Sequence, residues 1–306
     1  MTELRYQLLP NRDPEAADVL VLPVPHELTV SYRAGTHNGP DALLAATAQL
    51  EYYDEDLAWS PFQHLGVSVL PTLEKTLWER PEDFHRRLGE ATAALRRDSL
   101  LLCLGGEHSI TPSLVAGRMP GPGTVVMLDA HADLRPSYEG SAYSHACPGH
   151  RLRAAGHRLL LVGVRSLMDA EAERIEADAG IDCYMARRLR QSAAWDALLA
   201  QLAALSGPVW LSIDMDVFDP GQAGSVGTPQ PGGLGWYDVC ELVEACLANP
   251  AVDLRGADIV ELIPDPAQVT DMVAAKLSQR IIACWGRAQG YENGPRNGSQ
   301  TEVDYH

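Results

Sequence analysis

"LLLCLGGEHS", residues 100–109, is an apolar run that ends in two glycines and then presents three polar side chains. Every position up to Leu104 is apolar, which is typical of a strand covered on both of its faces. The glycines allow the chain to turn sharply where the strand ends, so we expect His108 at the edge of a sheet. The same arrangement, a buried strand followed at once by polar residues, recurs along the chain.

Apolar runs of this kind alternate with amphipathic stretches. The runs predict strands at 18–24, 66–70, 99–104, 124–129, 158–164, 209–214 and 257–263, and the amphipathic stretches predict helices at 39–53, 81–97, 169–180, 193–207, 235–250 and 268–285. This alternation predicts an α/β fold with a mostly parallel sheet covered by helices on both faces. We expect a single domain over residues 1–289 and a polar, glycine-rich, disordered tail at 290–306.

The overall composition excludes several classes of partner. A net charge of -17 opposes binding to nucleic acid or to anionic membranes. No apolar run reaches the roughly 18 residues that a membrane span requires, and the first twenty residues lack the features of a signal peptide. The six cysteines are scattered, without a CxxC pair, and predict reduced core residues. We therefore expect a cytoplasmic protein.

Polar clusters follow four of the expected strands. They are "GGEHS" with His108, "LDAHAD" with Asp129, His131 and Asp133, "SIDMDVFDP" with Asp214 and Asp216, and "VELIP" with Glu261. In parallel α/β sheets, ligands bind beyond the carboxyl ends of the strands. Residues two apart face the same way on an extended backbone, so each motif is expected to aim its ligands to one side.

Four carboxylates and two imidazoles in one cleft indicate a metal site. The carboxylates would repel one another strongly unless some took up protons or cations were bound. Two divalent cations would neutralise them and could activate a shared water, and the excess of carboxylates favours Mn²⁺ over Zn²⁺. The remaining negative charge, together with Glu261, favours a cationic substrate such as a guanidinium, whose planar fork a carboxylate binds well.

Each motif alone has a plainer interpretation. A single DxD at a strand end often caps the following helix, and Asp219 in "VFDPG" is expected to shape a turn. The occurrence of all the motifs at successive strand ends favours the metal site.

The motifs "GGEHS", "DAHAD" and "SIDMDVFDP", in this order, resemble those of the ureohydrolase family, which includes arginases, agmatinases and guanidinobutyrases. The resemblance runs from about "VLPVPHE" to "LSQRIIACW". It implies a three-layer α/β/α sandwich, the arginase-like fold, and two Mn²⁺ ions per chain. One ion would be bound by His108, Asp129, Asp133 and Asp214, and the other by Asp129, His131, Asp214 and Asp216. The resemblance also implies a homotrimer or homohexamer.

Further roles follow from the same resemblance. His145 in "YSHACP" matches the proton-shuttling histidine of the family, and Glu261 matches the glutamate that binds the guanidinium. Asp133 would move the proton from the attacking water to the leaving amine. Arginases carry an asparagine two residues before that histidine, to engage the head group of arginine, whereas this sequence has Tyr143 there. Tyr143 is therefore a candidate substrate-binding residue.

The substitution at this position favours agmatine, cleaved to putrescine and urea. Gly224 and Gln230 depart from the usual agmatinase pattern, so guanidinobutyrate, aminopropylagmatine and arginine remain alternative substrates. A single-zinc amide hydrolase and a non-catalytic subunit are further alternatives. The first has no use for His108 and Asp216, and the second usually loses metal ligands, which are all present here.

Overall fold

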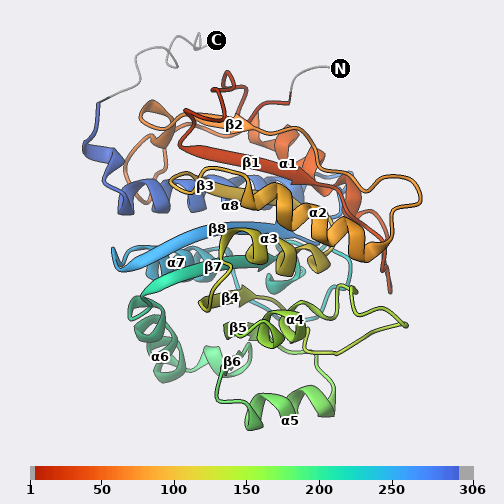
Figure 1. Ribbon diagram of the computed structural model, residues 1–306. Helices are drawn as coiled ribbons and strands as arrows, with labels where there is room; N and C mark the ends of the chain where they lie inside the picture. The colour runs from red at the N-terminus through yellow and green to blue at the C-terminus, as the bar shows by residue number, and fades with distance from the viewer. Residues whose placement is uncertain (1–3, 296–306) are drawn as a thin grey trace.

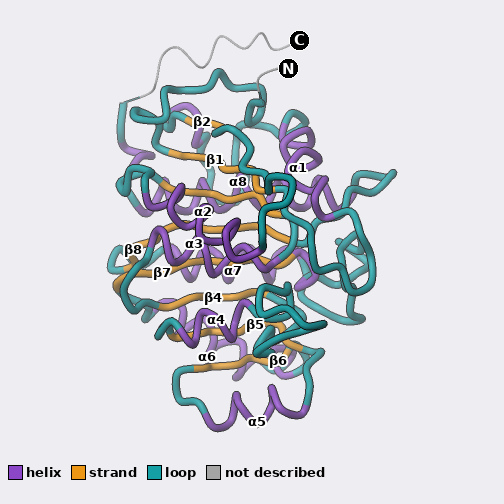
Figure 2. Tube along the Cα trace, turned by 45° about the vertical axis from the view of Figure 1, so that its right-hand side comes forward, coloured by secondary structure: helices purple, strands orange, loops and turns teal. Residues whose placement is uncertain are grey.

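The computed structural model describes residues 4–295 of the chain. Its eight strands are β1 (Val19–Val24), β2 (Val67–Val69), β3 (Leu100–Gly105), β4 (Thr124–Leu128), β5 (Arg158–Val164), β6 (Ile181–Met185), β7 (Gly207–Asp214) and β8 (Val252–Val260). They form one sheet in the order β2-β1-β3-β8-β7-β4-β5-β6 (Figure 2). Every pair of neighbouring strands is parallel. The predicted parallel sheet is confirmed.

Helices cover both faces of this sheet (Figure 1). They are α1 (Gly39–Thr47), α2 (Pro81–Ala93), α3 (Thr111–Arg118), α4 (Pro148–Ala154), α5 (Asp169–Ala177), α6 (Ser192–Ala203), α7 (Trp236–Leu247) and α8 (Val269–Ala288). Residues of α1, α6, α7 and α8 belong to one hydrophobic cluster, and residues of α2, α3 and α4 to a second. The structure is thus the predicted three-layer α/β/α sandwich.

The strand β3 shows why its sequence is apolar throughout. Leu100, Leu102 and Leu104 pack into the first cluster, whereas Leu101 and Cys103 pack into the second. Alternate side chains of a strand point to opposite faces. In a strand that is buried on both faces, every position therefore favours an apolar residue. Each fully buried leucine of this kind contributes roughly 1.5–3 kcal/mol relative to an exposed one.

Three short elements were not predicted from the sequence. The edge strand β6 reads "IDCYM", and its polar residues mask the strand pattern. The helices α3 and α4 have 8 and 7 residues and directly follow the polar motifs, which read as loops. The strand β8 begins at Val252 rather than at Ala257 and ends at Val260, so Glu261 lies just beyond it.

The expected tail is only partly described. Residues Tyr291–Asn293 form a 3-10 turn, in which the Tyr291 ring packs on Trp285 and its hydroxyl donates a hydrogen bond to Asp18. This part of the tail is packed against the domain, and residues 296–306 lie outside the described residues.

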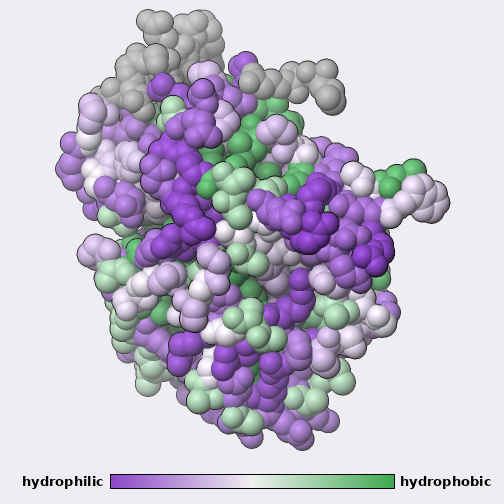
Figure 3. Space-filling model, viewed as in Figure 1, coloured by the Kyte–Doolittle hydropathy of each residue, from purple (hydrophilic) through white to green (hydrophobic). Residues whose placement is uncertain are grey.

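The exterior agrees with the composition. Hydrophilic residues cover much of the face shown in Figure 3. Within residues 4–295, no helix has both the length and the apolar character needed to cross a membrane. The six cysteines form no disulfide, and all but Cys183 are buried, as expected of reduced core residues.

Candidate metal centre

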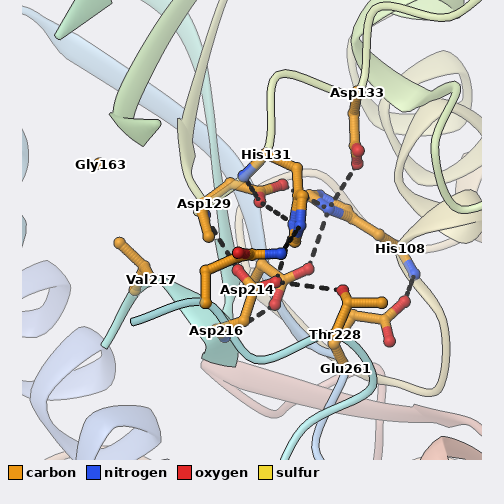
Figure 4. Close-up of polar contacts among 12 residues, drawn as sticks. His108, Asp129, His131, Asp133, Gly163, Asp214, Asp216, Val217, Thr228 and Glu261 are labelled. Carbon is orange, nitrogen blue, oxygen red and sulfur yellow. Dashed lines mark hydrogen bonds and ion pairs between the residues drawn. The ribbon is translucent and has the colours of Figure 1, made fainter. Parts of the chain in front are cut away.

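The four strands that carry the polar motifs are neighbours in the sheet. Their order is β3-β8-β7-β4, so their carboxyl ends lie side by side at one edge. His108 begins a 3-10 turn shortly after β3, Asp129 directly follows β4, Asp214 ends β7 and Glu261 follows β8. Motifs that are far apart in the sequence therefore lie together in a single site, because their strands are adjacent in the sheet (Figure 4).

The local backbone differs from the extended runs that the spacing implied. Asp214 accepts a hydrogen bond from the backbone N–H of Asp216 at 2.8 Å, which closes a 3-10 turn at Met215–Val217. Asp133 and Glu261 adopt left-handed backbone conformations, with φ of 52° and 64°. Such conformations are unusual for residues other than glycine and gather at functional sites. The side chains converge because of these turns, not because the strands continue.

Two groups of potential ligand atoms share one aspartate. His108, Asp129 and Asp133 form the first group, and Asp129, His131 and Asp216 form the second. The ligand atoms within each group lie within 4.8 Å of one another. A carboxylate that belongs to both groups is suited to bridge two cations.

The distances in the first group centre on His108. Its Nδ1 atom lies 3.1 Å from Asp129 Oδ2 and 3.2 Å from Asp133 Oδ2. Asp214 Oδ2 lies 3.4 Å from the same nitrogen. In the second group, His131 Nδ1 lies 2.9 Å from Asp216 Oδ2 (Figure 4).

The donors fit divalent cations. Within residues 4–295, His108 Nδ1 and Asp129 Oδ2 are buried and lie 3.1 Å apart, but neither makes a well-aligned hydrogen bond. A buried polar atom without a good hydrogen bond costs about 1–3 kcal/mol, so such atoms call for an explanation. Both atoms face the centre of the cluster, where a cation would accept their lone pairs. Carboxylate and imidazole ligands without thiolates suit a hard or borderline metal such as Mn²⁺.

The electrostatics of the cluster lead to the same conclusion. Burial raises the pKa of Asp133 to about 7 and that of Glu261 to about 8, and it raises the pKa of Asp214 well above its usual range. Burial alone would lower the pKa of His131, but hydrogen bonds to two flanking aspartates raise it to about 12. The cluster without cations must therefore hold extra protons, which bound cations would displace.

His108 is oriented by residues that the sequence analysis missed. Its Nε2 atom lies 2.9 Å from Ser212 Oγ, and Ser212 donates a hydrogen bond to Asp258 at 2.6 Å. Because the hydroxyl proton is committed to Asp258, Ser212 accepts from the Nε2–H of His108, so Nδ1, which faces the aspartates, is the nitrogen that could offer a lone pair to a cation. The sequence feature that could have identified them is a polar residue within an apolar strand, Ser212 in β7 and Asp258 in β8.

Two glycines allow close approach within the site. Gly163, with φ of 98°, leaves no room for a side chain: a Cβ there would lie 2.8 Å from Val217 and 3.2 Å from the backbone oxygen of Asp129 (Figure 4). A Cβ at Gly227 would lie 2.5 Å from Oε2 of Glu261. The Glu261 carboxylate is thus seated against bare backbone, while its Oε1 accepts the backbone N–H of His108 at 2.8 Å.

A cleft of about 260 Å³ opens over the cluster. His108, Asp133, Asp214 and Glu261 lie at its lining, and the walls beyond them include Tyr138, His145, Met168 and Gln230. The His145 ring contacts Thr29 Oγ1 through Nδ1 at 3.0 Å and Ser31 Oγ through Nε2 at 3.1 Å. Burial lowers the pKa of His145, so its ring is neutral near pH 7.

Tyr143 lies apart from this cleft. Its ring stacks on His85 at 4.9 Å and lies under the guanidinium of Arg151 at 4.3 Å. These residues line a separate depression beside α2 and α3. The structure does not bring Tyr143 to the candidate metal centre, because the chain between Tyr143 and His145 turns and sends the two side chains to different pockets.

Comparisons with known proteins agree with the fold and the cluster. A family model described as "Arginase family" matches residues 17–284. A protein of Synechocystis sp. named N(1)-aminopropylagmatine ureohydrolase is 35% identical to this chain, and the match covers 89% of this chain and 90% of the relative. A protein of Thermus thermophilus with the same name is 38% identical, and the match covers 90% of this chain and 93% of the relative. The crystal structure of agmatine ureohydrolase of Thermoplasma volcanium superposes with a TM-score of 0.81 at 30% identity and covers 95% of this chain and 96% of that one.

Proposed function

The chain belongs to the arginase family and is a hydrolase of guanidino C–N bonds, and we propose that it acts on a linear polyamine guanidine, with N1-aminopropylagmatine as the preferred substrate. Hydrolysis of this compound yields urea and spermidine. Agmatine, which yields urea and putrescine, is the second candidate, supported by the likeness to agmatine ureohydrolase of Thermoplasma volcanium.

One observation carries the proposal: the His and Asp cluster and the Glu261 carboxylate face the same cleft. The cluster supplies ligands for cations, and Glu261 supplies the counter-charge for a guanidinium next to them. This pairing supports hydrolysis over simple metal storage, because a storage site has no need of an additional carboxylate beside it.

In the proposed site, two divalent cations, with Mn²⁺ favoured, would be held by the six predicted ligands. These are His108, Asp129, His131, Asp133, Asp214 and Asp216. When bound, such cations would lower the pKa of a water and stabilise charge that develops in the transition state. Asp129 would be shared, since its two oxygens belong to different groups.

Three side chains then act on the substrate and its protons. Glu261 Oε2, seated against Gly227, accepts N–H bonds from the guanidinium and orients its carbon. Asp133 takes a proton from the attacking water and delivers it to the leaving amine nitrogen. His145, which lines the cleft beside the exposed Ser31, carries the remaining proton to solvent.

The charge of the cleft supports the proposed substrate class. Its floor holds the aspartate cluster and Glu261, whereas the basic residue on its wall, Arg135, lies over the Tyr138 ring at 4.5 Å and 3.9 Å from Glu171 Oε2. An arginine head group would bring its carboxylate into this acidic surrounding. A polyamine brings only positive charges, which supports the amine-ended guanidines.

A panel of guanidines tests this assignment. Urea release by the Mn²⁺-loaded chain should give a kcat/KM for N1-aminopropylagmatine about tenfold above that for agmatine, the value of one additional charge-assisted contact of roughly 1.4 kcal/mol. Arginine and 4-guanidinobutyrate should be poorer substrates than both. Urea and amine should appear in equal amounts.

Arg135→Gln is the matched control for the panel. It removes the cation from the wall of the cleft and should leave the order of preference unchanged. If 4-guanidinobutyrate were the best substrate and Arg135→Gln abolished its turnover, Arg135 would bind a carboxylate and the proposed substrate class would be wrong.

A further inference from the structure

The loop at residues 27–36 borders the cleft through Ser31 and is held by two carboxylates. Glu27 Oε1 accepts the backbone N–H groups of Gly35 and Thr36 at the far end of the loop. Glu107, from the "GGEHS" motif, accepts the backbone N–H groups of Leu28 and Thr29 at 2.7 Å each. Glu107 is 3% exposed, so these buried hydrogen bonds connect the segment that follows β3 to the loop.

Glu107 also contacts the side chain that holds His145. Its Oε1 atom accepts hydrogen bonds from Ser109 Oγ and, at 3.1 Å, from Thr29 Oγ1. With two backbone N–H groups on Oε2 and two hydroxyls on Oε1, the carboxylate is surrounded by donors and acts only as an acceptor. The proton of the Thr29 hydroxyl is therefore committed to Glu107.

The hydroxyl of Thr29 has three hydrogen-bond partners, which is its full capacity. It donates once, to Glu107, and has two lone pairs left. One lone pair accepts the backbone N–H of His145 at 3.0 Å, and the other lies 3.0 Å from His145 Nδ1. Because the hydroxyl has no second proton, Nδ1 must be the donor. A neutral His145 ring then carries its proton on Nδ1 and a lone pair on Nε2.

We propose that Glu107 is a positioning residue that, through Thr29, fixes His145 in the Nδ1–H tautomer and so keeps Nε2 as its proton acceptor. The inference rests on the proposed function in one respect, which is that His145 transfers a proton during the reaction. Nε2 lies 3.1 Å from the hydroxyl of Ser31, which is exposed and lines the cleft, so the basic nitrogen lies where the cleft meets solvent. The arrangement follows a general rule that a third group orients a proton-transferring histidine.

Glu107→Gln should reverse this chain of hydrogen bonds while keeping the loop in place. The amide oxygen can still accept the backbone N–H groups of Leu28 and Thr29, but the amide nitrogen, in the place of Oε1, donates to Thr29 Oγ1. The two lone pairs of the hydroxyl are then used by this amide and by the His145 backbone. The Thr29 proton must point to Nδ1, so His145 changes to the Nε2–H tautomer.

The tautomer is measured directly by solid-state NMR of the full chain labelled with ¹⁵N-histidine and loaded with a diamagnetic divalent cation. His145→Asn identifies the resonances of His145. We expect the Nδ1–H pattern in the unmodified chain and in Thr29→Ser, and the Nε2–H pattern in Glu107→Gln.

Thr29→Val, which lacks the hydroxyl, should lose the preference for the Nδ1–H tautomer. It tests the same hydrogen-bond chain if Glu107→Gln does not fold. Glu27→Gln, at the other end of the loop, is the matched control and should retain the Nδ1–H form.

Kinetics provide a second readout. In Glu107→Gln, kcat should fall by about a hundredfold, the lower end of the range that positioned proton transfer contributes, with little change in KM. Adding His145→Asn should cost little more, because both changes remove the same step.

An Nε2–H pattern in the unmodified chain, or an unchanged pattern in Glu107→Gln, would overturn the proposal. The tautomer is read without turnover. A chain that releases no urea but shows the expected tautomers would contradict the proposed function and leave this inference standing.

Discussion

Asp129→Asn is expected to lower the turnover of guanidines by at least about a thousandfold, since stabilisation by the bound cations contributes several kcal/mol. Asp129 belongs to both ligand groups, so its loss weakens two cation sites at once. Asparagine keeps the shape of the side chain, and the residue lies beyond the end of β4, so the fold should persist. Urea release and elemental analysis of the purified variant measure the two effects.

Asp219→Asn is the matched control for this prediction. Asp219 lies in the same "SIDMDVFDP" motif, but its carboxylate accepts the backbone N–H of Gly221 and shapes a turn. The variant should keep its cations and turnover within about threefold, as substitutions outside the site usually do. If Asp129→Asn matched this control in both cation content and turnover, Asp129 would not be a ligand shared by two cations.

Glu261→Gln is expected to lower kcat/KM by about a hundredfold to a thousandfold, because removal of one partner of a buried charge pair costs roughly 2–5 kcal/mol. Glutamine can still accept the backbone N–H of His108, so the cation content should not change. The prediction is checked by measuring kcat/KM together with the number of bound ions.

Gly227→Ala tests the same role without removing the charge. Its Cβ would lie 2.5 Å from Glu261 Oε2 and must displace the carboxylate. We expect a loss of kcat/KM in the same direction, with cations retained. If both variants lost their cations instead, Glu261 would act through the metal ligands and not through the substrate.

Much of the candidate site could be predicted because its residues directly follow buried strands. The apolar runs identify the strands, and a parallel sheet brings their carboxyl ends to one edge. His108, Asp129, Asp214 and Glu261 are gathered in this way, since β3, β8, β7 and β4 are adjacent. The long loops at this edge, which Figure 2 shows in teal, carry further lining residues of the cleft, among them Ser31 and Tyr138.

The conformation of the chain beyond each strand could not be predicted from spacing. Asp216 reaches the cluster through a 3-10 turn, and Asp133 through a left-handed residue, although both were expected on extended backbone. Tyr143 was matched by its position relative to His145, but a turn between them sends it to the depression beside α2 and α3.

The missed residues act through contacts distant in sequence. Glu107 holds Thr29 from 78 positions away, and Ser212 meets His108 from 104 positions away. Such pairs depend on the packing of whole loops and strands, which a local sequence pattern does not specify. For the Ser212 contact, the local sign was a polar residue within an apolar strand, as at Ser212 and Asp258.

The central claim, that a pair of cations at this sheet edge supports hydrolysis of a polyamine guanidine, is tested most directly by titrating the metal-free chain with Mn²⁺. Bound ions are counted by equilibrium dialysis while urea release from N1-aminopropylagmatine is measured in the same samples. The account predicts that about two ions bind per chain and that urea release rises with the second of them. Full activity with a single tightly held zinc ion, or no urea release at two bound Mn²⁺ ions, would contradict it.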